Sequence, residues 1–273
     1  YLTGLEYDLE VYCPLDDKGC YVKDKYMPDE LIGLSVLEKT NGCHANHKVI
    51  EILTREKRLL GKENYHHQYP HCWRSKTPVV FRAMDQWFVS LDKNDLREDC
   101  IKKLDEVKFT PDWGANRIKG FLESRPDWCI SRQRSWGVPI PVFFDQEGNP
   151  LLDSNLIRFL ANKVEQFGSD IWFSSDEKSL LDGYQLDDEW KDKKLLKGGD
   201  TLDVWIDSGC SHRSVLRENE DVSWPADLYL EGSDQHRGWF QSSLWTSMTS
   251  YESAPYKRIL THGFVVDGDG RKI

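Results

Sequence analysis

The chain has 273 residues, 39% of them apolar, so it is long enough for one large domain or two unequal domains with a proper hydrophobic core. Its net charge of -10 excludes a protein that holds nucleic acid by a general positive charge, so any contact with RNA must be local. The sequence has no apolar run of about 18 residues and no basic, apolar leader, so we expect a cytoplasmic protein without membrane contact.

Residues 1–70 mix short strand-like runs and turns with one helical stretch. Residues 9–12 have the pattern of a strand, and residues 45–60 carry apolar side chains at helical spacing, at Val49, Ile52 and Leu53. This part begins without an obvious first strand. We therefore expect it to be the trailing part of a larger, mixed β-rich domain.

A second domain is expected at 71–273, and its first part alternates strands and helices. Strand-like segments occur at 79–81 and 86–90, a helix is predicted at 96–104, and an apolar run spans 138–144. Residues 145–200 then turn acidic, with 13 Asp and Glu against 7 Lys and Arg. Such a composition is typical of a solvated insertion.

The last stretch, residues 201–273, has the strongest pattern. Phe240, Leu244 and Met248 form an apolar stripe on a helix predicted at 236–250. That helix lies between two predicted strands, so the pattern indicates a βαβ unit in an α/β sheet. Residues 265–270 carry two Asp-Gly pairs and predict a hairpin turn. The strands are predicted at 202–206, 227–230 and 258–261.

Residues 231–240 (EGSDQHRGWF) concentrate acid, amide, imidazole and guanidinium groups at one strand end. Ligands of open α/β sheets bind beyond the carboxyl ends of the strands, so the polar groups at 207–212, 231–237 and 261–263 should gather along one edge. Gly232 and Gly238 permit close backbone approach. A polar turn between two core elements is the simpler alternative, but the density of hydrogen-bonding groups favours a ligand site.

A second region is locally basic and contains tryptophans, a composition that suits phosphates and stacked bases. Tryptophans in the core, with the arginines paired to the abundant carboxylates, explain it equally well. The Walker A, GxGxxG and GxSxG signatures are all missing, which leaves P-loop, dinucleotide and serine-hydrolase functions without support. The basic region comprises Arg117, Lys119, Arg125, Arg132 and Arg134, with Trp113, Trp128 and Trp136.

The seven cysteines are scattered, and no two have the Cys-Xaa-Xaa-Cys spacing of a zinc ribbon or redox motif. Reduced thiols of a cytosolic protein are the expected state. Core or surface positions explain the histidine-rich stretches more simply than a zinc site does, so we expect no structural zinc. The residues considered as metal ligands are Cys43, His44, His47, His66, His67, His71 and Cys72.

Four blocks resemble bacterial-type isoleucyl-tRNA synthetases, in order along the chain. They are DWCISRQRSWGVPIP at 127–141, DTLDVWIDSG at 200–209, YLEGSDQHRGWF at 229–240 and THGFVVD at 261–267. Segments 11–19 and 69–74 resemble the tail of the inserted editing domain and its return to the catalytic core. The resemblance covers essentially the whole chain. It implies an editing-domain remnant at 1–70, and at 71–273 the second half of the Rossmann-like parallel sheet of a class I synthetase.

This resemblance implies an enzyme, thought to be a monomer, that activates isoleucine with ATP and Mg²⁺ and esterifies the 3′ end of tRNA(Ile). Hydrolytic editing of misactivated valine would accompany it, and no side chain of this segment is expected to act as a catalytic group. The resemblance implies adenylate contacts from Glu231, Gly232, Asp234 and Gln235, pocket walls from Trp239 and Trp205, and nucleotide contacts from His262 and Gly263.

The departures from the family pattern concern the groups that hold ATP. No His-Xaa-Gly-His occurs, and Lys272 begins the KMSKS signature but is followed by Ile273 where Met is usual. Ser75 stands where some relatives have a second zinc-binding cysteine. We expect an internal piece of a longer enzyme that forms no adenylate alone, because the missing groups stabilise charge on the phosphates. A truncated, non-catalytic paralogue that binds tRNA or aminoacyl-adenylate, and an unrelated Rossmann nucleotidyltransferase, are the alternatives.

Overall fold

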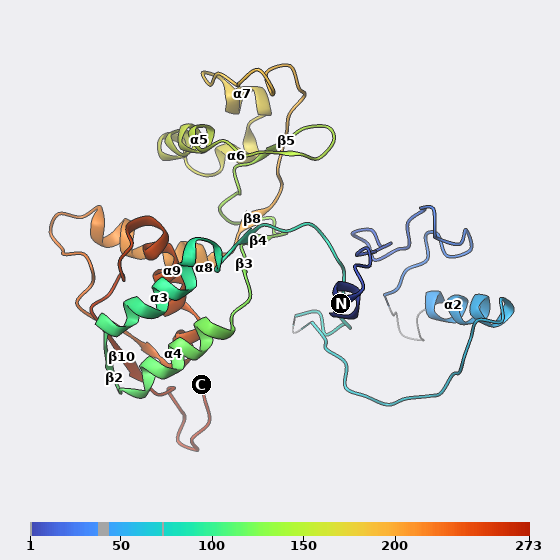
Figure 1. The fold of residues 1–273 in the computed structure, drawn as a ribbon, viewed down its shortest axis with the longest axis horizontal. Coiled ribbons are helices and arrows are strands. Elements are labelled where there is room, and N and C mark those ends of the chain that lie inside the picture. The colour runs from blue at the N-terminus through green and yellow to red at the C-terminus, as the bar shows by residue number, and fades with distance from the viewer. Residues whose placement is uncertain (1, 38–43, 73) are drawn as a thin grey trace. The chain divides into compact units, whose positions relative to one another are not determined.

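The computed structural model describes residues 2–37, 44–72 and 74–273. The chain divides into two compact units, Tyr1–Asp85 and Gln86–Ile273 (Figure 1). The division therefore falls after Asp85, whereas the sequence suggested a boundary after residue 70.

The first unit contains little regular structure. Among its described residues, the helices are α1 (Leu2–Glu6) and α2 (His44–Arg55), and strand pairing is limited to isolated bridges such as Leu15 with Tyr21. Helix α2 ends at Arg55, before the predicted residue 60, because Lys57 adopts a left-handed φ of 55°.

The strands expected at 9–12 and 79–81 do not form, so these two predictions are wrong. The side chains of Leu9 and Val11 are 62% and 64% exposed, and within the described residues no neighbouring strand covers them. An apolar alternation stabilises a strand only when a partner strand and a core are present.

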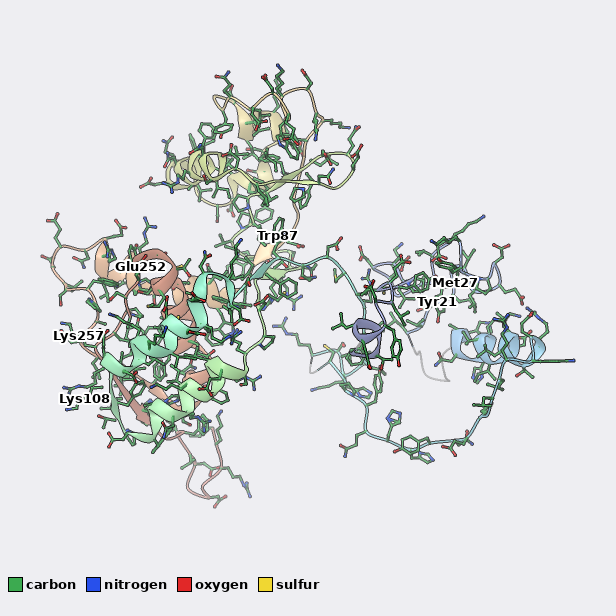
Figure 2. All side chains as sticks on the ribbon, in the orientation of Figure 1. Tyr21, Met27, Trp87, Lys108, Glu252 and Lys257 are labelled. Carbon is green, nitrogen blue, oxygen red and sulfur yellow. The ribbon has the colours of Figure 1, made fainter. Side chains whose placement is uncertain are left out.

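The second unit is built on a parallel sheet in the order β2, β10, β9 (Figure 1). These strands are β2 (Lys108–Thr110), β9 (Tyr229–Gly232) and β10 (Arg258–His262). Helix α9 (Trp239–Tyr251) joins β9 to β10, so the predicted βαβ unit is confirmed. Lys108 and Lys257 mark the end of the sheet where β2 and β10 begin (Figure 2).

One hydrophobic core joins this sheet to its helices α3 (Leu96–Lys103), α4 (Trp113–Ser124) and α9. The predicted helix at 96–104 is thus confirmed. The apolar stripe of α9 lies in this core, as its pattern predicted. The core comprises Leu91, Cys100, Leu104, Val107, Phe109, Ile118, Leu122, Trp128, Tyr229, Phe240, Leu244, Trp245, Met248, Ala254, Tyr256 and Ile259.

The prediction of a strand at 202–206 is wrong. Only Thr201–Leu202 is extended, as β8, and Val204–Gly209 forms helix α8, which packs against α9. The Asp203 carboxylate accepts a hydrogen bond from the backbone N–H of Trp205 and so caps α8. A short, mostly apolar run is compatible with either a strand or a buried helix, and the hydrogen bond from this cap stabilises the helix.

The acidic stretch folds into a small lobe with its own core, so it is more than a solvated insertion (Figures 1 and 2). Strand β5 (Phe143–Phe144) pairs with β6 (Pro150–Leu151) and β7 (Leu196–Lys197), and α5 (Ser154–Phe167) packs beside them. Leu156, Leu160, Trp172, Leu180, Trp190 and Leu195 are among the buried side chains of the lobe.

Short elements complete the second unit. Antiparallel pairs join β1 to β3 and β4 to β8, close to the root of the acidic lobe. No helix among the described residues is long and apolar enough to cross a membrane. The remaining elements are β1 (Phe88–Val89), β3 (Trp128–Cys129), β4 (Ser131–Arg132), α6 (Ile171–Ser174), α7 (Glu177–Leu181), the short 3₁₀-helices η1 (Lys93–Asp95), η2 (Leu104–Glu106) and η4 (Ser233–Arg237), and the π-helix η3 (His212–Arg217).

The contact between α8 and α9 generates a first prediction. A Cβ atom on Gly209 would lie 2.8 Å from the backbone oxygen of Ser242, so Gly209→Ala should push the helices apart. We expect it to lower the free energy of unfolding by about 1–3 kcal/mol. Gly120→Ala is the matched control, because Gly120 is exposed in α4 with open space around it. Thermal unfolding of the complete protein measures both, and equal melting temperatures would contradict the predicted clash.

Buried His212 generates a second prediction. Its Nδ1 lies 3.4 Å from the Trp224 indole N–H, and burial, with Arg217 and Arg213 nearby, lowers its pKa from 6.5 to about 4. Between these pH values the unfolded chain binds more protons than the folded one. Stability should therefore fall by up to about 3 kcal/mol as the pH drops through this range.

His212→Asn should make that pH dependence shallower, whatever it does to absolute stability. Urea unfolding followed by tryptophan fluorescence, repeated from pH 6.5 down to about 4, measures the slope. The exposed His66 provides the control variant His66→Asn. An unchanged slope in His212→Asn would show that another group is responsible for the loss of stability.

Candidate functional site

The polar ends of β9 and β10 meet at one edge of the sheet. Their parallel register places Thr261 opposite Glu231 and His262 opposite Gly232. The side chain of Glu231 is exposed and, within the part of the chain that the structure describes, makes no hydrogen bond or ion pair. The imidazole of His262 is also exposed, with Nδ1 2.6 Å from the Gly263 oxygen. The predicted gathering of polar residues at one edge is thus confirmed for residues 231–232 and 261–262.

Asp234 and Gln235 continue this edge on the turn η4. The Gln235 amide donates to the Asp234 carboxylate at 3.1 Å, and its carbonyl oxygen accepts from the backbone N–H of Trp239 at 2.9 Å. Gln235 thereby satisfies a free donor at the start of α9. Helix α9 therefore begins at Trp239 and not at His236, as the apolar pattern had suggested.

Trp239 and Trp205 lie on either side of Gly238. The indole of Trp239 stacks on Tyr229, with ring centroids 3.9 Å apart, and its N–H donates to the Ser208 backbone oxygen at 2.9 Å. Trp205 is 41% exposed, and a Cβ atom on Gly238 would lie 3.1 Å from its ring. The structure thus brings both tryptophans close to the polar edge, and only glycine fits between Gln235 and Trp205.

The polar residues at 207–212 serve helix packing and do not extend the sheet edge. They lie on α8 and the following turn, where Ser208 and Ser211 accept the Trp239 indole N–H. The expectation that all three polar segments share one edge is therefore wrong for this segment. Helix α8 carries the segment away from the strand that the sequence suggested.

His236 is a core residue, although it lies within the polar decapeptide. Its side chain is fully buried between Trp113 and Phe240, with Nδ1 2.9 Å from the Ser233 oxygen. Burial lowers the pKa of His236, so the ring is neutral near pH 7. A Cβ atom on Gly114 would approach Nε2 at 3.0 Å, so a larger residue there would require the imidazole to shift.

Lys272 stands at the end of the hairpin predicted at 265–270. The hairpin is confirmed, because Val266 and Lys272 form a bridge and the Asp267 N–H donates to the Arg271 oxygen at 2.8 Å. The ammonium of Lys272 lies 3.9 Å from the ring centroid of Phe264. Lys272 thus follows β10 by a short, ordered connection.

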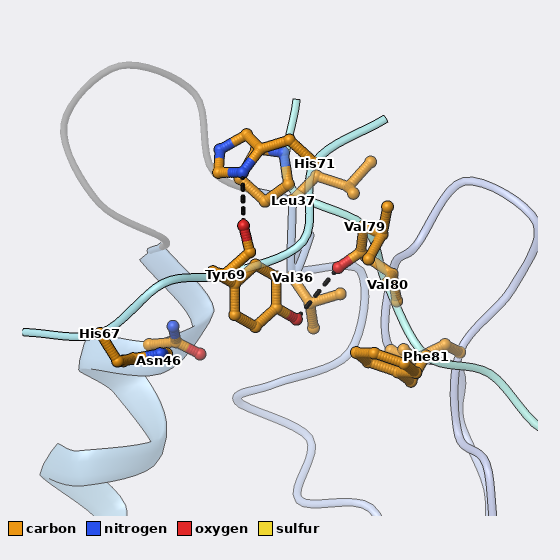
Figure 3. A pocket seen from close by; sticks show the side chains of 11 residues that line it. Val36, Leu37, Asn46, His67, Tyr69, His71, Val79, Val80 and Phe81 are labelled. Atoms are coloured by element: carbon orange, nitrogen blue, oxygen red, sulfur yellow. Dashed lines mark hydrogen bonds between the residues drawn. The ribbon is translucent and has the colours of Figure 1, made fainter. Parts of the chain in front are cut away.

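The candidate metal ligands do not come together in the described residues. These residues contain no group of three or more His, Cys, Asp or Glu side chains placed to hold a metal, and Cys43 and Trp73 lie outside them. His67 and His71 line a pocket of about 630 Å³ in the first unit, where the Tyr69 hydroxyl donates to the Val79 oxygen (Figure 3).

The interpretation of the basic region as core tryptophans and paired cations is confirmed for some of its members. Trp128 is buried, Lys119 pairs with Asp105 at 2.5 Å and Arg132 pairs with Asp203, as expected of core and surface residues. Trp136, however, is 89% exposed. Arg125 also departs from simple ion pairing, because its described hydrogen bond goes to a neutral amide, that of Gln241.

Asp203 connects several elements in this part of the unit, and little in the sequence indicated this role. Its buried carboxylate accepts from the Trp128 indole at 3.1 Å and from the Arg132 guanidinium at 2.8 Å, besides capping α8. It therefore ties β3, β4 and α8 together. The one available signal was a lone acid within an apolar run, the position of a helix cap.

Comparisons with known proteins identify the family of the chain. The family model for class I tRNA synthetases (I, L, M and V) matches residues 6–273, so the chain belongs to that family and has its Rossmann-like fold. The isoleucine–tRNA ligase of Methylacidiphilum infernorum is 50% identical over 100% of this chain and 29% of its own length. That of Syntrophotalea carbinolica is 47% identical over the same shares. The chain thus spans under a third of the curated relatives it matches.

Among solved structures, methionyl-tRNA synthetase of Mycobacterium tuberculosis aligns with 72% of this chain and 30% of its own. The sequence identity is 16% and the TM-score is 0.41. A TM-score this low adds nothing to the family assignment, which depends on the family model alone.

The contacts of Asp203 generate a prediction. Asp203→Asn removes the buried negative charge and leaves the Arg132 guanidinium without an ionic partner, so we expect a loss of about 2 kcal/mol in unfolding free energy. Asp200→Asn is the matched control, because that carboxylate meets the neutral amide of Gln133. Urea unfolding of the complete protein measures both variants, and equal effects would refute the organising role of Asp203.

Proposed function

We propose that this chain is part of an isoleucine–tRNA ligase, which activates isoleucine with ATP and transfers it to the 3′ end of tRNA(Ile). The observation that carries the proposal is the edge of the sheet where Glu231, Asp234 and His262 meet. The identity of about half with isoleucine–tRNA ligases over the whole chain supports it. The same identity disfavours a non-catalytic paralogue or an unrelated nucleotidyltransferase.

Glu231, Gly232, Asp234 and Gln235 would bind the isoleucyl-adenylate. The exposed carboxylate of Glu231 has no described partner, so it is available to an ammonium group or a ribose hydroxyl. Gly232 has no side chain to cover the backbone beside it. The carboxylate of isoleucine would attack the α-phosphate of ATP and displace pyrophosphate, which leaves isoleucyl-adenylate. The protein would contribute orientation and charge stabilisation rather than a covalent intermediate.

Trp239 and Trp205 would wall the pocket for the aliphatic side chain. One face of the Trp239 indole is already covered by Tyr229, and its N–H is bonded, so the ring is held in one orientation. Flat apolar walls suit a branched alkyl group. Selection between isoleucine and valine by such a wall is limited, because one methylene changes binding by only about 1–3 kcal/mol.

The nucleotide would lie beyond the end of β10. His262 and Gly263 would contact it, and Lys272 would begin the second ATP-binding signature. Mg²⁺ would enter with ATP, since it usually takes few protein ligands and several phosphate oxygens. The described residues hold no preformed group of three or more His, Cys, Asp or Glu side chains for a metal.

The remaining parts of the proposal concern the whole protein. Residues 1–70 would be the last part of an editing domain that hydrolyses misactivated valine. Such an activity is needed because a binding pocket distinguishes poorly between side chains that differ by one methylene. The complete protein would act as a monomer in the cytoplasm. This segment alone would form no adenylate.

A variant of Glu231 tests the proposal. Glu231→Ala should lower isoleucine-dependent pyrophosphate exchange of the complete enzyme by about tenfold or more, because a charged hydrogen bond to the substrate is lost. Its melting temperature should stay unchanged, since Glu231 has no described partner in the fold. Glu165→Ala, at an exposed position of α5, is the matched control. Wild-type exchange in Glu231→Ala would exclude the role assigned to Glu231.

A further inference from the structure

A pocket of about 390 Å³ opens beside the first turn of α9, apart from the edge formed by β9 and β10. It lies where the end of α4 and strand β3 approach the turn η4 and α9. Three of its lining side chains are arginines, although the chain as a whole is acidic. The lining residues that matter are Arg125, Asp127, Trp128, Arg132, Arg237 and Gln241.

Two of these guanidinium groups have no described carboxylate partner. Arg125 is half-buried, and its described hydrogen bond goes to the Gln241 side-chain oxygen at 3.2 Å. Gln241 is buried and donates to the His236 backbone oxygen, which directs its carbonyl oxygen toward Arg125. The guanidinium of Arg237 is exposed and makes no hydrogen bond or ion pair with the residues that the structure describes.

The carboxylates near the pocket do not balance these charges. Asp203 is bonded to Arg132 and Trp128, and Asp127 is occupied in part by the Leu91 backbone N–H. Burial lowers the pKa of Arg125, Asp203 opposes this shift and Arg237 adds to it. Because arginine does not lose its proton in proteins, the two guanidinium groups remain charged, and an anion between them would relieve their repulsion.

Aromatic rings orient both groups. The Arg125 guanidinium lies 5.8 Å from the ring centroid of Trp128, and that of Arg237 lies 5.9 Å from the ring centroid of Phe121. Such contacts restrict a guanidinium to one plane. Planar arginine forks bind phosphate oxygens in pairs, which makes phosphate the matching anion.

We propose that this pocket binds a phosphate group, with Arg125 and Arg237 as its ligands and Arg132 as an auxiliary charge. The phosphate belongs either to the backbone of an RNA strand or to a free phosphate compound. The proposal does not depend on the ligase activity, because its residues differ from those assigned to the adenylate. The segment η4 nevertheless connects the two sites, because it contains both Arg237 and Gln235.

Two binding measurements on the complete protein separate the possible sources. Isothermal titration with inorganic phosphate tests for a free phosphate compound, and anisotropy of a fluorescein-labelled single-stranded RNA tests for a nucleic-acid backbone. In Arg125→Gln/Arg237→Gln, we expect affinity for the relevant probe to fall about tenfold or more. If RNA is the ligand, the plot of log affinity against log salt concentration should also become less steep, by about one unit of slope.

Matched variants keep the test specific to the pocket. Arg158→Gln/Arg258→Gln removes two exposed arginines elsewhere and should leave binding at the wild-type level. Asp127→Asn keeps an oxygen that accepts from the Leu91 backbone N–H but removes the negative charge. The variant should therefore bind the phosphate-containing probe several-fold more tightly. Equal affinity of the wild type and both double variants for both probes, or weaker binding by Asp127→Asn, would overturn the proposal.

Discussion

The parallel pairing of β9 with β10, which α9 connects, is the constraint on which the rest of the second unit depends. Ile259 of β10 pairs with Tyr229 of β9, and both side chains are buried beneath α9. A shift of this register would expose them, so the core holds the register in place. The same register places Glu231 beside Thr261 and brings the polar ends of both strands to one edge.

A second constraint is the close packing of α8 on α9. Gly209 allows the helices to approach, and Asp203 fixes the start of α8 while binding Trp128 and Arg132. Because Trp239 bonds to Ser208, this packing also sets the orientation of the indole proposed to contact isoleucine. Packing, helix capping and the candidate pocket are therefore consequences of the same few contacts.

The elements that could be predicted are those whose signal is local. The stripe of Phe240, Leu244 and Met248 indicated a helix between two strands, and the Asp-Gly pairs at 265–270 indicated a hairpin, and both form. The strand at 202–206 failed because a short apolar run fits either structure, and a side-chain cap decided between them. The strands at 9–12 and 79–81 failed because a strand needs a partner that the run itself does not specify.

By itself, the sequence determined the family, the βαβ unit and the residues that carry the proposed chemistry, because order, spacing and residue type are written along the chain. Only the tertiary structure decided that His236 is a core residue, that Gln235 caps a helix, and that Arg125 and Arg237 share a pocket. The first and the last of these depend on burial or on contacts between segments far apart in sequence, and the Gln235 contact depends on where α9 begins. Such contacts follow from packing, which no local pattern records.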